Sequence, residues 1–234
     1  MMAPATDWGP VMFGLWVVAL VLLMVYMKGE PRRRMARAAE ALGFQFTPED
    51  STLPWSISSP PPVVAGHIKL AGIEVNTPGI TLSLGEQLKS GETRIANVVR
   101  GFANGTSAVI FDCVVKNNST RRYAFQFSMG ARPPFILMPS RPLFKIDGAI
   151  ELEASPEFSS HHLLLSPEPE AVRALFKPAL ADFLEQQKSE RAWQYEVVGG
   201  WLVINPGYAR GRSIPDTFQK AAAIAAQFQA CLPR

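Results

Sequence analysis

The chain is poor in the residues that most often build disulfides, metal sites and catalytic dyads, with two cysteines and three histidines among 234 residues. Cys113 and Cys231 are too few for the disulfide framework of a secreted domain, and their apolar neighbours are typical of buried thiols. His67, His161 and His162 lack metal-binding spacing, and neighbouring histidines on a strand would point to opposite faces. We therefore expect no metal and no cofactor.

Motifs of enzymes are also missing. The glycine-rich, basic stretch 207–212 lacks the Gly-Lys-Ser/Thr ending of a phosphate-binding loop, and no nucleophile elbow occurs. A nucleophilic dyad would have to join Cys113 to His161 or His162, which are distant in sequence. The sequence thus predicts a protein that is not an enzyme. The alternative is a membrane-associated, hydrolase-like enzyme using these three residues.

Charge is absent from residues 9–26, which read GPVMFGLWVVALVLLMVY. As a helix, this segment reaches roughly 27 Å, close to the hydrocarbon core of roughly 30 Å. Trp8 and Tyr26 bracket it, as amphipathic rings do at the headgroup level. We predict a short N-terminus at 1–8 and a transmembrane helix at 9–27.

A basic collar, residues 28–37, follows this helix. Its five cations are Lys28, Arg32, Arg33, Arg34 and Arg37, and its one acid is Glu30. Because positive charge stays on the cytoplasmic side, we predict an extracytoplasmic N-terminus and a cytoplasmic domain at 38–234. The collar can also attract anionic lipid head groups.

The rest of the chain carries no excess charge. The net charge is +3, of which the collar supplies +4 and Asp7 supplies −1, so residues 38–234 are neutral. A nucleic-acid-binding domain needs a basic face, so no nucleic-acid partner is expected. The partners that remain are the bilayer, anionic lipid head groups and another protein.

Residues 38–234 alternate between strand and helix patterns. Asn104-Gly105 predicts a tight turn between strands at 94–102 and 107–115, and a third strand follows at 121–129 with one buried face. Further strands are expected at 135–138, 144–153, 158–165, 193–198 and 201–204. Helices are expected at 33–42, at 167–187 with a break at Pro178, and at 216–232. The predicted class is α+β, with helices on one side of an antiparallel sheet and a C-terminal helix.

The turn also predicts a polar pair. A two-residue loop at 104 and 105 sets Val99 opposite Ile110 and Asn97 opposite Asp112. Asp112 is the one acid in the apolar run 108–115, and a half-buried carboxylate needs a hydrogen-bonding partner. We interpret Asn97 and Asp112 as a structural pair rather than a catalytic site.

Three short stretches resemble those of uncharacterised bacterial single-pass membrane proteins: residues 38–44 (AAEALGF), 97–101 (NVVRG) and 110–112 (IFD). The resemblance implies an inner-membrane location and no functional residue. The sequence as a whole predicts a membrane-anchored cytoplasmic interaction or scaffold domain of unknown partner. Candidate contact residues are Trp55, Pro60 to Pro62 and Trp201, since aromatic side chains dominate binding hot spots.

Overall fold

A computed structural model provides the structure of the chain. It describes residues 9–48, 53, 66–70, 73–77, 93–115, 118–128, 132–140, 148–187, 190, 192–198, 200–207 and 213–231. Side chains at 9–15, 18, 21–29, 66–70, 73–77, 93 and 115 lie outside this description. Among the described residues, no helix is long and apolar enough to cross a membrane.

One antiparallel sheet of eight strands forms the centre of the domain, in the order β1-β4-β5-β6-β10-β9-β7-β8. The strands are β1 (Gln45–Thr47), β4 (Thr93–Ala103), β5 (Thr106–Val115), β6 (Asn118–Gln126), β7 (Phe135–Pro139), β8 (His162–Leu165), β9 (Gln194–Val198) and β10 (Trp201–Asn205). A separate hairpin joins β2 (Gly66–Leu70) to β3 (Ile73–Thr77). The α+β class is confirmed.

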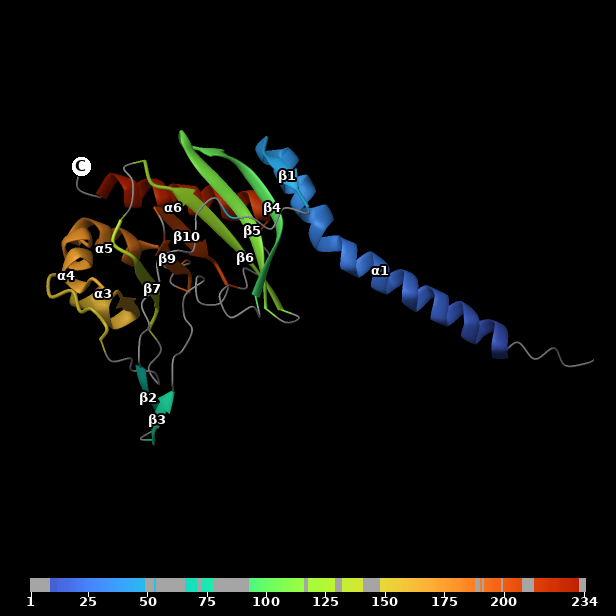
Figure 1. Ribbon diagram of the computed structural model, residues 1–234, viewed down its shortest axis with the longest axis horizontal. Coiled ribbons are helices and arrows are strands. Elements are labelled where there is room, and N and C mark those ends of the chain that lie inside the picture. Colours follow the sequence, from blue (N-terminus) through green and yellow to red (C-terminus); the bar gives the residue numbers. More distant parts are fainter. Residues whose placement is uncertain are drawn as a thin grey trace, which may run out of the picture.

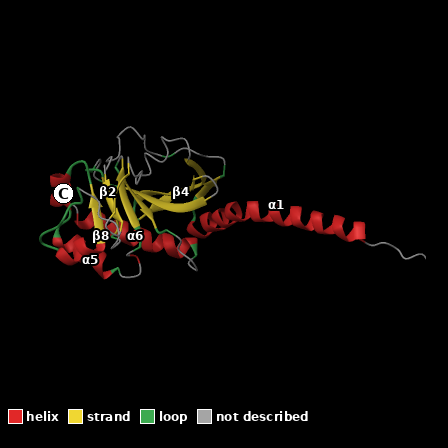
Figure 2. Cartoon of the chain, turned by 90° about the horizontal axis from the view of Figure 1, so that it is seen from below, coloured by secondary structure: helices red, strands yellow, loops and turns green. Residues whose placement is uncertain are grey.

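Helices cover one face of this sheet (Figure 2). They are α3 (Pro156–His161), α4 (Pro169–Leu175), α5 (Pro178–Gln186) and α6 (Ile214–Cys231). The predicted C-terminal helix is confirmed as α6, and its Phe218, Ala221, Ala225 and Phe228 are buried against the sheet in the larger hydrophobic core. The predicted break at Pro178 is also confirmed, and it separates α4 from α5.

The long helix α1 (Gly9–Leu42) projects from the domain and touches it only near its C-terminal end (Figure 1). Met35, Ala38 and Ala39 are buried there. The helix ends at Gly43, whose φ of 68° suits glycine, and the amide of Phe44 donates to the Ala39 carbonyl at 2.8 Å. This C-terminal turn directs the chain into β1.

The face of the sheet away from the helices is also buried, so the prediction of a single buried face is wrong. Val109, Phe111 and Cys113 of β5 belong to a second hydrophobic cluster, and Leu53 packs against it. Arg122 of β6 is only 4% exposed. The apolar run of β5 reflects this burial, because a strand that is covered on both faces has successive apolar residues instead of alternating polar and apolar ones.

The region 144–165 differs most from the prediction. No strand covers the described residues 148–153, and the strand expected at 158–165 is instead helix α3 followed by the short edge strand β8. Pro156 at the first helical position and Glu157 in the first turn favour a helix start here. The helix expected from 167 begins at Pro169, because Ser166 Oγ donates to the Pro134 carbonyl and accepts from the Glu168 amide.

The C-terminal helix begins two residues before the predicted Asp216. Ser213 acts as its cap, since Ser213 Oγ accepts from the Asp216 amide at 3.2 Å and donates to the Asp216 carboxylate at 2.6 Å. The capping pair is therefore Ser213 with Asp216, and the cap lies three residues before Asp216, the predicted first residue of the helix.

Candidate functional site

A surface cavity of about 580 Å³ lies where α1 enters the domain. It is lined by Leu42, Gly43, Phe44, Gln45, Arg100, Gly101, Phe102, Ser107, Ala108, Val109, Gln126 and Trp201. Phe102 is 73% exposed, whereas Trp201 is 5% exposed and belongs to the core. The lining mixes aromatic, aliphatic and polar residues, and the volume lies within the range of about 300–1,000 Å³ that ligand pockets occupy.

One wall of the cavity depends on a close contact between β1 and β4. Gln45 pairs with Arg100, which places Phe44 beside Gly101. A Cβ atom built on Gly101 would lie 2.2 Å from Cδ1 of Phe44, so only glycine leaves room for the ring. The ring also meets Phe218 of α6 edge-on, with centroids 5.1 Å apart. Gly101 thus fixes the aromatic wall of the cavity.

We expect Gly101→Ala to lower the free energy of unfolding by about 1–3 kcal/mol, because the new methyl group would overlap the Phe44 ring. Denaturant titration of Gly101→Ala, Phe44→Ala and the double variant measures the effect. With the ring removed, the methyl group should cost little, so the double variant should be more stable than the sum of the single losses allows. Additive losses would show that Gly101 and Phe44 act independently.

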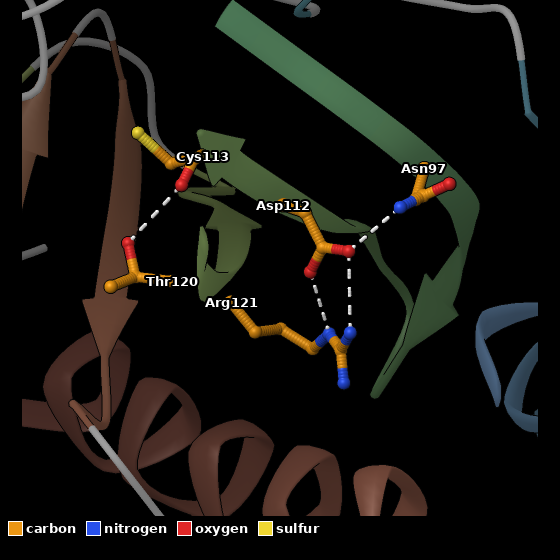
Figure 3. Close-up of polar contacts among 5 residues, drawn as sticks. All are labelled: Asn97, Asp112, Cys113, Thr120 and Arg121. Carbon is orange, nitrogen blue, oxygen red and sulfur yellow. Dashed lines mark hydrogen bonds and ion pairs between the residues drawn. The ribbon is translucent and has the colours of Figure 1, made fainter. Parts of the chain in front are cut away.

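The predicted polar residues Asn97 and Asp112 lie next to each other (Figure 3). Asn97 Nδ2 donates to Asp112 Oδ2 at 2.9 Å. The predicted register holds from Ala103 to Val99 but is wrong by one residue at Asp112, which pairs with Ala96 because the ladder shifts between Ala96 and Val99. Asn97 lies in this bulge with a φ of 54°, a left-handed conformation that asparagine tolerates.

Arg121 is the partner of Asp112 that sequence reasoning missed. It pairs with Asp112 across β5 and β6, and its Nε donates to Oδ1 at 2.9 Å while Nη2 donates to Oδ2 at 3.3 Å. Asp112 is 1% exposed. Its carboxylate accepts hydrogen bonds from a bidentate guanidinium and from one side-chain amide. Both carboxylate oxygens accept hydrogen bonds from these structural donors, which does not suit a catalytic base.

Cys113 does not meet His161 or His162. Cys113 lies on β5 in the cluster opposite the helices, whereas the histidines lie at α3 and β8. Five strand spacings of about 4.8 Å separate β5 from β8, which gives roughly 24 Å. Burial raises the pKa of the Cys113 thiol, which disfavours the reactive thiolate. The hydrolase-like alternative loses the dyad on which it depended.

The two histidines also correct an assumption about metal binding. His161 ends α3 and His162 begins β8, so they are not neighbours on one strand. His161 Nδ1 lies 3.1 Å from Glu185 Oε2, and His162 Nδ1 lies 3.0 Å from Glu185 Oε1. The opposite-face argument against a shared site is therefore wrong.

The collar residues lie along the projecting helix. Arg32, Arg33, Arg34 and Arg37 are exposed on α1, and the side chain of Lys28 lies outside the described residues. Arg34 Nε donates to Glu30 Oε1 at 2.8 Å, and this hydrogen bond lowers the pKa of the Glu30 carboxyl. Glu30 thus offsets the charge of one arginine.

The other contact candidates from the sequence divide into two groups. Trp55 and Pro60 to Pro62 lie outside the described residues. Trp201 is buried at the start of β10 and lines the cavity, so it is a core residue with one edge at the candidate site. The exposed aromatic residue of this region is Phe102, which has no distinguishing pattern in the sequence.

Comparison with known proteins shows a shared fold. No family model matches the chain, and no curated protein matches it significantly. Among solved structures, the mycobacterial trehalose monomycolate transport factor A, TtfA, is similar with a TM-score of 0.55 and 14% sequence identity. The alignment covers 86% of this chain and 96% of TtfA. At this identity the similarity establishes the fold and leaves the function open.

Proposed function

We propose that this chain is a membrane-anchored, non-catalytic interaction protein of the bacterial inner membrane. Residues 9–27 anchor it with the N-terminus outside, the basic collar 28–37 lies at the cytoplasmic surface, and the folded domain receives a protein partner in the cytoplasm. The structurally similar TtfA is by name a trehalose monomycolate transport factor, and a transport role is compatible with this proposal.

The observation that carries this proposal is the projection of α1 from the domain (Figure 1). Trp16 is 70% exposed and Val17 is 44% exposed, whereas Met35 is the first buried residue among the α1 side chains that the structure describes. An uncharged segment of this length, with large apolar side chains such as Trp16 exposed among its described residues, is stabilised by an apolar environment. A bilayer supplies one, and the collar then meets the anionic head groups.

The cavity lies close to the proposed membrane surface. From Tyr26 to Leu42 the helix rises about 24 Å at about 1.5 Å per residue, and Leu42 is the first cavity residue. A partner that contacts Phe102 therefore lies no farther from the bilayer than the radius of a typical domain. This position favours another membrane protein over a freely diffusing one.

The experiment places a photo-crosslinking amino acid at Phe102 of the full-length chain in its own inner membrane. We expect a discrete adduct with one protein, because Phe102 is exposed at the rim of the cavity. The matched control carries the crosslinker at Glu170, whose side chain is 82% exposed on α4, and it should give no such adduct. Alkaline phosphatase fused to the C-terminus of the chain should show no activity in the same cells.

Two outcomes contradict the proposal. Equal adducts at both positions would show that Phe102 reports only crowding at the membrane. Strong phosphatase activity, or recovery of the untagged chain in the soluble fraction, would overturn the orientation or the anchor.

A further inference from the structure

Side chains from α3, β8 and α5 meet at the end of the sheet far from α1. Glu157 and His161 are four residues apart on α3, so they share one face of that helix. Glu185 of α5 faces them, and the three residues bring ligand atoms within 4.8 Å of one another. This cluster contains an imidazole nitrogen and two carboxylates, and the proposed function does not use it.

A second histidine lies against Glu185 from its other side. Its Oε1 lies 3.0 Å from Nδ1 of His162, whose side chain is 2% exposed. The His162 ring stacks on Phe158 with centroids 4.6 Å apart, so the imidazole cannot turn freely. Carboxylates that bind metal ions are oriented by such outer partners, which leave the second oxygen directed at the ion.

We propose that Glu157, His161 and Glu185 bind one Zn²⁺ ion, and that His162 is a positioning residue for Glu185. In a tetrahedral site with bonds of about 2.0–2.2 Å, ligand atoms lie about 3.4 Å apart. His161 Nδ1 and Glu185 Oε2 are 3.1 Å apart, close to this separation. The exposed Glu157 side chain can rotate to complete the set.

The types of ligand atom and their exposure indicate which ion binds and what its binding does to the fold. An imidazole ligand favours Zn²⁺ over Mg²⁺ and Ca²⁺, which prefer sites made of oxygen atoms. The His161 side chain is 39% exposed, which leaves a fourth position for water. Because the ligands come from both α3 and α5, the ion ties these two helices together next to edge strand β8.

The test measures Zn²⁺ binding to the full-length chain in detergent by calorimetry, and Co²⁺ substitution by its visible absorption. We expect one ion per chain and a Co²⁺ spectrum of a four-coordinate site. His161→Ala and Glu157→Gln should each weaken binding by about tenfold or more, and His162→Gln by about 10–100-fold. Glu153→Gln, an exposed carboxylate just before α3, and His67→Ala are the controls and should bind normally.

Near-UV circular dichroism verifies that each variant is folded, and His161→Ala is the decisive one because its side chain is partly exposed. Zn²⁺ affinity that is unchanged in both His161→Ala and Glu157→Gln would overturn the site. Absence of binding at micromolar Zn²⁺ would overturn it as well and would leave a hydrogen-bonded pair of His161 and Glu185. Loss of Zn²⁺ binding in His67→Ala alone would show that the ion binds at a different site. None of these results depends on the membrane partner at Phe102.

Discussion

Asp112→Ala is expected to lower the free energy of unfolding by about 3–5 kcal/mol, because removal of one member of a buried ion pair leaves the other without its partner. The Asp112 side chain is 2% exposed and that of Arg121 is 23% exposed, so water cannot fully replace the lost carboxylate. Asn97 also loses its acceptor at 2.9 Å. Denaturant titration of the folded chain measures the loss directly.

Single and combined alanine variants of Asn97, Asp112 and Arg121 separate the two contacts. We expect the Asp112 and Arg121 losses to be strongly non-additive, since they remove the same bidentate pair. Asp182→Ala, an exposed carboxylate on α5, is the control and should change stability by less than about 0.5 kcal/mol. A stable Asp112→Ala protein that has lost cellular function would instead make Asp112 a functional acid.

The hairpin around Asn104-Gly105 shows how far local sequence signals reach. Asn104 and Gly105 have φ of 51° and 77°, as a tight primed turn requires, and Val99 does pair with Ile110. The turn sets the register only as far as Val99. The bulge that contains Asn97 has no local signal, because the Asp112 carboxylate that binds its side chain comes from the next strand.

Interactions between distant segments explain what the sequence could not predict. The candidate cavity combines Leu42, Phe102 and Trp201, which come together only when β1 and β10 join the same sheet. Glu185 lies more than twenty residues from His161, and its approach depends on how α5 packs on α3. By contrast, the C-terminal helix and the break at Pro178 depend on local patterns, and the sequence predicts both.

Phe218→Ala is expected to lower the free energy of unfolding by about 3–5 kcal/mol and to destabilise the segment 43–47 that follows α1. Phe218 is 5% exposed on α6, and its ring meets Phe44 at 5.1 Å, Phe125 at 5.5 Å and Tyr123 at 6.4 Å between centroids. It therefore joins the sheet to the segment that follows α1. Amide hydrogen exchange over residues 43–47 of the full-length chain in detergent should become faster in this variant.

Phe228→Ala is the matched control because it removes an equally large ring from the same helix. Phe228 is fully buried and contacts Phe135, Phe176 and Tyr195, away from Phe44. It should lower stability by a similar amount without selectively speeding exchange at residues 43–47. Equal exchange in the two variants would show that residues 43–47 open only when the whole domain unfolds. Faster exchange in Phe218→Ala alone would show that α6 holds the proposed anchor helix, and with it the aromatic wall of the cavity, through this one ring.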